Sequence, residues 1–539
     1  MCRIQEDTKM CDSLKTYPVP HEAELSGDYS LLVNGREVHV YKARVSAMPF
    51  NQVWPGYQRP IDQTELASFG YWDMTGPVEV EVISSRPVKE VVIRPLARGI
   101  IPTVKNNRIT FTMPGPGPCT VEINGVHFAL HLFGKPFEGA TPDFGQGRVL
   151  DASVYKELYT RKPAPDPKDF EVLFFPPGIY EVGKITVRPG QTVYISGGAV
   201  VYGVIEGRHA SGIRILGRGI LDGSHVPRIN TFGVTSPVQP FGTILLYDCE
   251  DVEISGIVIR DSNCYAITPI ACRRVRIADV SIIGQWRYNT DGIDLLNCEN
   301  VLIEKCFVRT FDDSIVIAGI SDVSILGDYQ IGNRPSRDIT VRDCVIWNDW
   351  GRALEIGALT HAEEITDVAY LNCDIIHTTH VALDIQNGDH ALVRNISYED
   401  IRVELDDHAQ TPVFQKHLME KYRDDGHGTY CPLLFVLEVK SLIYSVSKER
   451  GHISHVSLRN VRTIGSKIPK SYMAGYDAQH QVDDVTIDHL RIGDCLVTDT
   501  STGCISTHAH VQNVVFNPDR TSRLSYSSER PSLVSGGGL

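Results

Sequence analysis

The sequence lacks a hydrophobic run long enough to cross a membrane, and basic residues are too few to balance the acidic ones. Its 539 residues include 52 lysines and arginines against 66 aspartates and glutamates, a formal net charge of −14. No stretch approaches the roughly 20 apolar residues of a membrane span, so no membrane partner is expected. The excess of negative charge also disfavours nucleic acid as a partner, because phosphates are themselves anionic.

An apolar signal core is missing from the start of the chain. The opening stretch, "MCRIQEDTKMCDSLKTYPVP", carries charged residues where a secretory signal needs an apolar run. We therefore expect a cytoplasmic location. The 13 cysteines are an odd number, and without export they are expected to be reduced thiols that fill the core.

Helical patterns of ten to fifteen residues are absent between the apolar segments, which excludes an alternating βαβ chain. Short β-rich runs separated by Gly, Pro and Asn turns predict a β-sandwich over residues 17–135. The stretch 136–170 is rich in Pro, Gly and Asp and is expected to be a linker. Residues 171–516 form the second predicted domain, and the Ser-rich stretch 517–539 is expected to be a flexible tail.

The second domain repeats itself. Segments of alternating β-branched residues, each followed by a turn, begin at Val252, Val275, Val301, Ile339, Val393, Ile453 and Val482. The first three starts differ by 23 and 26 residues, and a period in the twenties with strand alternation predicts a parallel β-helix. Cys249, Cys272 and Cys298 each lie three residues before a repeat start. They are expected to stack as a buried ladder.

Aspartates gather in two motifs one repeat apart, "NTDGID" and "FDD". Asp312 and Asp313 follow Asp291 by 21 and 22 residues, which is one coil. Because adjacent coils lie about 4.8 Å apart, the three carboxylates should share one wall. Like charges that close raise at least one pKa, which leaves a proton donor beside ionised partners. As sequence neighbours, Asp312 and Asp313 must sit at a strand end or a bulge, because a regular strand would point them to opposite faces.

These motifs carry a family resemblance. "NTDGID", "CENVLIEKCFVRTFDDSIVI" and "GRALEIGA" follow the order and spacing found in the polygalacturonase family of glycoside hydrolases, over roughly residues 170–400. The preceding sandwich, "FFPPGIYEV" and "NDWGRALEIG" are similar to the dextranase and isopullulanase family. The resemblance implies an all-β protein, with a pectin lyase-like right-handed parallel β-helix preceded by a β-sandwich. It also implies hydrolysis of an α-linked polysaccharide with inversion, without a metal or cofactor.

The resemblance also implies roles for individual residues. Asp312 would be the general acid, and Asp291 and Asp313 would hold and deprotonate the attacking water. Asn289 would contact sugar nearby. Asp294 matches an acidic position of the same motif and is interpreted as structural support.

Two departures from the polygalacturonase pattern concern the substrate. The family's Gly-His-Gly is Gly351, Arg352 and Ala353 here, so a permanently charged guanidinium replaces the histidine. The family's Arg-Ile-Lys, which holds a galacturonate carboxylate, aligns with Asp384, Ile385 and Gln386. An acid and an amide in place of two cations would repel a uronate and favour neutral hydroxyls. Arg352 or Arg287 remains an alternative clamp for a carboxylate.

Other residues near the motifs are candidates for binding sugar. Trp286 and Tyr288 precede the first motif and could stack on a sugar ring, with ordinary packing as the alternative. His361, His377 and His380 have no acidic or thiol partner at ligand spacing, so no metal site is expected. His377 and His380 remain candidate donors to sugar.

The function expected from these observations is an inverting glycoside hydrolase acting on α-glycosidic bonds of a neutral or weakly charged oligo- or polysaccharide. Cleavage from a chain end is a further hypothesis, with the insertion at 411–433 closing one side of the cleft. An exo-acting hydrolase of galacturonan oligosaccharides is the first alternative, and a non-catalytic carbohydrate-binding β-helix is the second. A lyase or epimerase is disfavoured because the motifs offer no nearby Lys. The sequence leaves the oligomeric state open.

Overall fold

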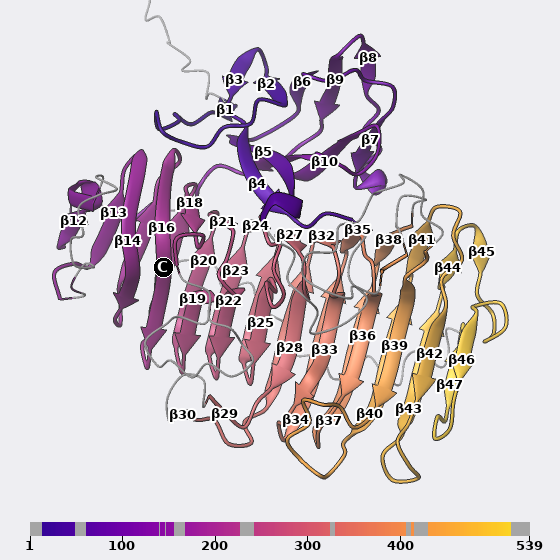
Figure 1. The fold of residues 1–539 in the computed structure, drawn as a ribbon. Helices are drawn as coiled ribbons and strands as arrows, with labels where there is room; N and C mark the ends of the chain where they lie inside the picture. The colour runs from indigo at the N-terminus through magenta and orange to yellow at the C-terminus, as the bar shows by residue number, and fades with distance from the viewer. Residues whose placement is uncertain are drawn as a thin grey trace, which may run out of the picture.

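The computed structural model describes residues 13–48, 61–139, 141–145, 147–155, 166, 168–226, 242–323, 329–405, 411–413 and 430–518. Within these ranges the regular secondary structure is almost entirely strand, and no helix is long and apolar enough to cross a membrane. Most of the predicted loop at 411–433 and of the predicted tail at 517–539 lies outside the described residues. The predicted fold class, a β-sandwich followed by a right-handed parallel β-helix, is confirmed (Figure 1).

The N-terminal sandwich consists of two mostly antiparallel sheets. One sheet contains β1 (Leu14–Lys15), β4 (Tyr41–Val45), β5 (Glu65–Met74), β7 (Val91–Arg94), β10 (Gly117–Ile123) and β11 (Leu130–Lys135). The other contains β2 (Tyr29–Val33), β3 (Arg36–Val38), β6 (Val78–Ser84), β8 (Thr103–Lys105) and β9 (Arg108–Met113). Alternate residues of β6, Val78, Val80 and Val82, are buried with Trp72 between the sheets. This period of two is what makes one face of each strand the core.

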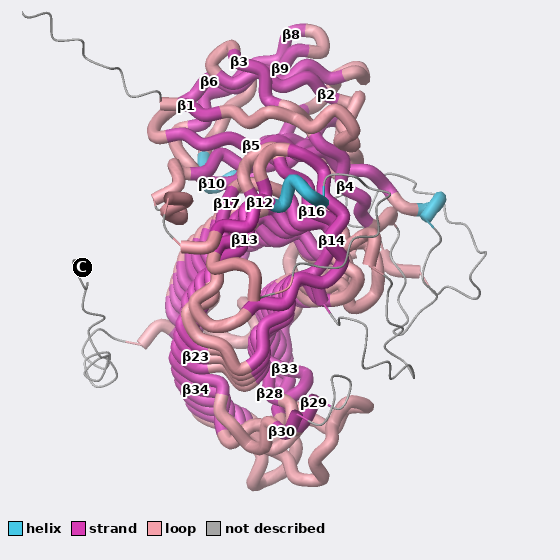
Figure 2. Tube along the Cα trace, turned by 90° about the vertical axis from the view of Figure 1, so that its left-hand side faces the viewer, coloured by secondary structure: helices cyan, strands magenta, loops and turns pink. Residues whose placement is uncertain are grey.

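The β-helix begins within the predicted linker, where β12 pairs in parallel with β13. One wall is a 13-stranded parallel sheet of β12 (Val149–Asp151), β13 (Val172–Phe175), β15 (Thr192–Ile195), β17 (Arg214–Gly217), β20 (Glu250–Ser255), β23 (Arg273–Ala278), β26 (Glu299–Glu304), β31 (Ser336–Arg342), β34 (Glu364–Leu371), β37 (Leu392–Glu399), β40 (His452–Arg459), β43 (Val482–Asp488) and β47 (Val514–Phe516). All seven predicted repeat starts lie in this sheet. Figure 2 views the stack end-on, so that successive coils overlap.

The strands of the remaining walls join in a second, 21-stranded sheet. Its members are β14 (Gly178–Val187), β16 (Ala199–Arg208), β18 (Ile220–Asp222), β19 (Gly242–Tyr247), β21 (Val258–Arg260), β22 (Tyr265–Ile270), β24 (Ser281–Ile283), β25 (Ile293–Leu296), β27 (Phe307–Thr310), β28 (Ile315–Gly319), β32 (Val345–Asn348), β33 (Arg352–Thr360), β35 (Asp374–His377), β36 (Val381–Asn387), β38 (Arg402–Glu404), β39 (Leu433–Val439), β41 (Arg462–Ile464), β42 (Ser471–Ala474), β44 (Arg491–Ile492), β45 (Cys495–Leu496) and β46 (Ile505–Thr507). Three short 3-10 helices, η1 (Ile61–Gln63), η2 (Leu96–Arg98) and η3 (Ala152–Tyr155), and a hairpin of β29 (Asp322–Val323) and β30 (Tyr329–Gln330) complete the described elements.

A left-handed residue interrupts each of the eight consecutive strands from β20 to β43 of the 13-stranded wall at the same place. The set is Asp251, Arg274, Asn300, Asp338, Asp367, Asn395, His455 and Asp484, all with φ between 51° and 57°. Asp and Asn tolerate this conformation because their short side chains can hydrogen-bond locally. The residues after them resume one continuous register, Val252 beside Val275 and Val275 beside Val301. Buried side chains therefore stack directly on their counterparts in the next coil.

The predicted cysteine ladder is present. Cys249, Cys272 and Cys298 are completely buried, and the Cys249 backbone N–H lies 3.4 Å from the Cys272 Sγ. A second buried series, Cys306, Cys344 and Cys373, was not predicted. The cysteines that the structure describes are all unpaired thiols. Stacking identical small side chains fills the same corner of each coil without a void.

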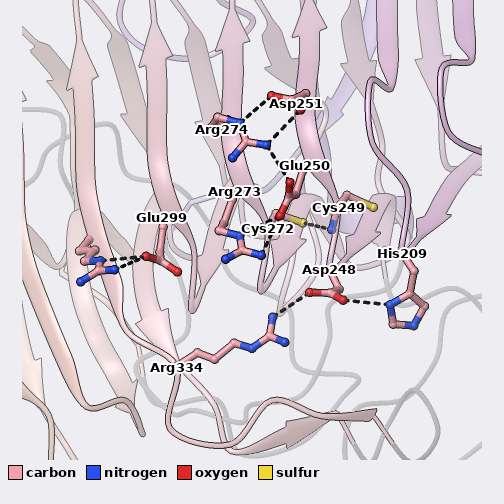
Figure 3. A network of polar contacts seen from close by, with 11 residues as sticks. His209, Asp248, Cys249, Glu250, Asp251, Cys272, Arg273, Arg274, Glu299 and Arg334 are labelled. Atoms are coloured by element: carbon pink, nitrogen blue, oxygen red, sulfur yellow. Dashed lines mark hydrogen bonds and ion pairs between the residues drawn. The ribbon is translucent and has the colours of Figure 1, made fainter.

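Opposite charges face each other across coils on the outer side of the 13-stranded wall (Figure 3). Arg273 and Arg274 reach back to Glu250, and Arg274 also pairs with Asp251. Farther along the same wall, Glu304 accepts hydrogen bonds from Arg276 at 2.7 Å and from Arg342 at 2.6 Å. Because parallel register puts identical positions side by side, alternating their sign avoids a column of like charges.

The sandwich docks along one side of the β-helix (Figure 1) through apolar packing and buried ion pairs. Phe69 and Phe133 of the sandwich belong to one buried cluster with Phe307 and Trp347 of the helix. Other contacts are the Arg218 Nε to Asp73 Oδ1 pair at 2.8 Å, and the links from Arg94 to Glu404 and from His377 to Glu122, each 2.5 Å. The interface therefore fixes the sandwich against successive coils.

Replacing Glu304 with Gln should lower the free energy of unfolding by about 1–2 kcal/mol at pH 7, since two charge-assisted hydrogen bonds weaken. Burial alone would raise the pKa of Glu304, but hydrogen bonds from Arg342 and Arg276 hold that pKa below its usual value. The carboxylate therefore stabilises the fold above the unfolded-state pKa, and this contribution fades as the pH falls through the lower folded pKa. Urea unfolding at pH 7 and pH 3.5, with exposed Asp338→Asn as control, measures the effect; an equal loss at both values contradicts it.

Candidate active site

The two aspartate motifs meet on one wall of the β-helix, as the spacing predicts. Asp291 lies in the turn before β25, and Asp312 and Asp313 lie in the turn between β27 and β28, one coil later. Placing the pair between strands resolves the problem of adjacent side chains, as expected. The Gly292 N–H donates to the Asp313 carbonyl at 2.9 Å, which fixes the two turns side by side.

Backbone contacts hold these carboxylates in place. The backbone N–H of Asn289, which has φ of 55°, donates to Asp312 Oδ2 at 2.9 Å. The Arg352 N–H donates to Asp313 Oδ1 at 2.7 Å. Gly351 directly precedes Arg352, and a Cβ there would lie 2.5 Å from Asp313 Oδ1. Only glycine therefore lets the backbone come this close to Asp313. The Asn348 amide donates to the Asp312 carbonyl at 2.7 Å.

Burial and mutual repulsion keep protons in this cluster. Asp291, Asp294 and Asp312 are 6%, 3% and 4% exposed. Burial, reinforced by the charges of Asp294, Asp312 and Asp313, raises the pKa of Asp291 well above its usual value. Burial and the neighbouring charges of Asp313 and Asp312 raise the pKa of Asp294 in the same way. Asp291 and Asp294 thus hold their protons to a higher pH than ordinary aspartates do.

Arg352 is the cation of this wall, and carboxylates surround it. Its Nε lies 2.8 Å from Asp384 Oδ2 and 3.7 Å from Glu355 Oε1, and its Nη1 lies 3.5 Å from Asp313 Oδ1. The three acids come from three successive coils, because β33 pairs with β28 on one side and with β36 on the other. The guanidinium charge is therefore shared within the protein.

Asp384 is completely buried, so the structure places it behind Arg352 rather than in an open subsite. Gln386 Nε2 donates to Asp384 Oδ2 at 2.5 Å, and Gln386 itself is only 4% exposed. Burial raises the pKa of Asp384 to about 6, against the opposing effect of Arg352. As direct sugar contacts, both residues stay predictions. Their observed contact is with each other.

The two aromatic candidates are packed within the protein. Trp286 and Tyr288 are each 7% exposed. Trp286 Nε1 donates to Asp261 Oδ1 at 3.1 Å, and Arg287 lies over its ring. Tyr288 meets Phe311 and Trp350 edge-to-face, at centroid distances of 5.1 and 5.4 Å. The alternative of ordinary packing thus describes their observed contacts, and a sugar contact stays a prediction.

Sequence reasoning did not single out three side chains that converge on the same wall. Glu355 is 1% exposed beside Arg352. Tyr265 and Tyr444 lie close enough to the aspartates that burial and the charge of Asp291 or Asp312 raise the pKa of each phenol. Glu355 could have been singled out from the sequence, because it occupies the position that Asp384 occupies in the next coil.

The candidate histidines pair within the protein or lie beside the site strands. His377 pairs with Glu122 of the sandwich at 2.5 Å, and His361 meets His390 at a ring distance of 4.5 Å. His380, which is exposed, precedes β36. Within the described ranges, no three His, Cys, Asp or Glu side chains are grouped so that they could hold a metal ion.

Known proteins resemble this arrangement. Residues 192–427 match the model of glycosyl hydrolases family 28. Polygalacturonase QRT2 of Arabidopsis thaliana is 24% identical over 202 residues, which is 36% of this chain and 42% of that protein. The chain spans between 18% and 48% of the length of the curated relatives it matches. The predicted resemblance to the polygalacturonase family is confirmed.

Solved structures match over more of the chain. Dex49A from Penicillium minioluteum superimposes with a TM-score of 0.65 at 16% identity, covering 93% of this chain and 96% of that one. The family 28 exopolygalacturonase of Yersinia enterocolitica has a TM-score of 0.47 at 12% identity, covering 82% and 94%. At such low identity the likeness to Dex49A shows the fold, sandwich included, and leaves the substrate to be argued from the site.

Replacing Arg352 with Met should destabilise the protein by about 3 kcal/mol at pH 8, because Asp384 loses its cation in a buried position. The loss should be smaller at pH 5. Without Arg352 the folded-state pKa of Asp384 rises beyond its present value of about 6, so the fold then favours the protonated acid and is penalised as the pH rises.

Urea unfolding of Arg352→Met at both pH values measures this effect. The double variant Arg352→Met with Asp384→Asn should recover part of the stability at pH 8, since one of the unpaired charges is then absent. Equal destabilisation at pH 5 and pH 8, without recovery in the double variant, would contradict the pairing.

Proposed function

We propose that the protein is an inverting glycoside hydrolase that cleaves α-glycosidic bonds of a neutral or weakly charged oligo- or polysaccharide. The observation that carries this proposal is the cluster of Asp291, Asp294, Asp312 and Asp313 on one wall, in which burial and like charges keep some carboxyls protonated. Glycosidic cleavage needs such a mixture, an acid for the leaving oxygen and a carboxylate for water. The family match over residues 192–427 supports the same chemistry.

In the proposed mechanism Asp312 donates its proton to the glycosidic oxygen while the C–O bond breaks. Asp291 and Asp313 hold a water molecule on the opposite face of the sugar, and one of them takes its proton as the oxygen bonds to the anomeric carbon. The backbone N–H groups of Asn289 and Arg352 orient Asp312 and Asp313 for these roles. A single displacement of this kind inverts the anomeric configuration.

The charges around the cluster support a neutral or weakly charged substrate. Arg352 is paired with Asp384 and Asp313, Lys440 with Glu438 at 2.6 Å, and Arg287 with Asp261 at 2.5 Å. A uronate carboxylate needs a cation whose charge is not already neutralised. Neutral hydroxyls need only donors and acceptors, which the carboxylates and amides of this wall supply.

An exo-acting hydrolase of galacturonan oligosaccharides is the second candidate. The similarity to polygalacturonase QRT2 favours it. In that case substrate would draw Arg352 away from Asp384, at the cost of leaving a buried acid with a pKa of about 6. Binding of galacturonan should then strengthen as the pH falls toward 6 and level off below it, because the pKa of Asp384 rises above 6 when Arg352 leaves it.

Asp312→Asn should lower kcat by about 10²- to 10⁴-fold, the usual contribution of a general acid, while the thermal midpoint stays close to that of the parent protein. The test is release of reducing ends from neutral α-glucan and galactan oligosaccharides and from galacturonan oligomers, with chelator added in parallel. Asp338→Asn on the opposite wall is the matched control. Proton NMR of the first product should show the inverted anomer.

Each outcome decides between the candidates. Turnover of a neutral glycan that is lost in Asp312→Asn supports the proposal, and turnover of galacturonan alone supports the second candidate. Product with retained configuration contradicts the single displacement. Binding of oligosaccharides without turnover in the parent protein would instead indicate a carbohydrate-binding β-helix.

A further inference from the structure

Glu355 is a buried acid to which the proposed mechanism gives no task. It lies in β33, opposite Val316 of the preceding coil and Asp384 of the following one. Its neighbours along the strand, Leu354 and Ile356, point into the core, so Glu355 points to the outer face of the wall that carries the aspartates. It is 1% exposed.

The nearby hydrogen-bond donor, Arg352, contacts other carboxylates more closely than it contacts Glu355. Arg352 Nε lies 2.8 Å from Asp384 but 3.7 Å from Glu355 Oε1, and the Arg352 backbone N–H donates to Asp313. Neither carboxyl oxygen of Glu355 accepts a hydrogen bond from any residue in the described ranges. An ionised carboxylate without donors is unstable in such a place, whereas a protonated carboxyl is tolerated and can itself donate.

The charges around Glu355 also favour its protonated form. Burial and the charge of Asp313 raise the pKa of Glu355 well above its usual value, Arg352 opposes this, and Asp384 adds to it. The titratable groups that face it from the surrounding elements are Asp313, Arg352, Asp384, Tyr370, Tyr398 and Tyr444. The three phenols have raised pKa values and stay neutral. Asp384, with a pKa of about 6, changes charge on the acid side of neutrality.

Building on the proposed function, we propose that Glu355 is a positioning residue held as a neutral carboxyl, whose O–H donates toward Asp313 and leaves the Arg352 guanidinium to Asp384. Asp313 then keeps its negative charge and its orientation toward the attacking water. Ionisation of Glu355 would put a second negative charge against Asp313 and compete for Arg352. Activity should therefore fall on the alkaline side as Glu355 loses its proton.

Two substitutions separate this role from simple packing. Glu355→Gln keeps the shape and an N–H donor but cannot ionise, and Glu355→Leu removes the donor. We expect Glu355→Leu to lower kcat at the optimum about tenfold, the scale of one lost hydrogen bond, and Glu355→Gln to lose less. In Glu355→Gln the alkaline limb of the kcat profile should move up by about one pH unit or more, since the group that titrates is gone.

A second readout does not depend on turnover. Because a folded-state pKa above the unfolded value penalises the fold as pH rises, Glu355→Gln should have a thermal midpoint equal to or above that of the parent protein at pH 8. Glu304→Gln is the matched control and should be less stable than the parent there, since the pKa of Glu304 is shifted in the opposite direction. Infrared difference spectra between parent and Glu355→Gln should show the loss of a neutral carboxyl band at pH 7.

The outcomes are distinct. An alkaline limb that does not move in Glu355→Gln, or a carboxylate band lost in place of a neutral carboxyl band, overturns the proposal. Equal losses in both variants at every pH would make Glu355 a packing residue only. If the parent protein hydrolyses no glycoside, the proposed function fails, while the midpoint and the infrared spectrum still report whether Glu355 is neutral.

Discussion

The β-helix and its candidate site depend on the in-register stacking of parallel coils. Because each residue lies about 4.8 Å from its counterpart one coil away, positions far apart in sequence become neighbours in columns. Asp294, Val316, Glu355 and Asp384 form one such column. The same rule that stacks cysteines into the core brings aspartates together on the outside. A repeat fold thus concentrates like charges, and its chemistry follows from how those charges are relieved.

Relief comes from three sources on the acidic wall. Backbone N–H groups donate to Asp312 and Asp313, one guanidinium pairs with Asp384 and Asp313, and the remaining acids keep their protons. On the opposite wall the solution differs, because alternating Arg and Glu cancel pairwise near solvent. The wall with the aspartates therefore holds carboxyls with raised pKa values, whereas the Arg–Glu pairs of the 13-stranded wall do not require them. Ion pairs that stabilise the fold and carboxyls suited to catalysis thus lie on different walls of the β-helix.

Much of this could be predicted from sequence, because strand alternation and a period in the twenties are local signals. The Asp312–Asp313 pair predicted a strand end or bulge at its own position, since no regular strand can point both side chains to one face. What could not be predicted were pairings set by register across coils. Asp384 was expected to face hydroxyls, yet it lies against Arg352, and Glu355 was not singled out. Contacts such as Arg94 with Glu404, 310 positions apart, carry no local signal at all.

The docked sandwich reaches the candidate site through a chain of buried contacts. His131 of β11 accepts a hydrogen bond from Arg309 at 3.0 Å, because burial and Arg309 lower the pKa of the imidazole and keep it neutral. Arg309 in turn lies over Trp347, whose indole donates to Asp349 at 2.7 Å. Asp349 stands two residues before Gly351, where the chain must pass against Asp313 without a side chain. The sandwich is thus part of what fixes the turn on which the two catalytic candidates rest.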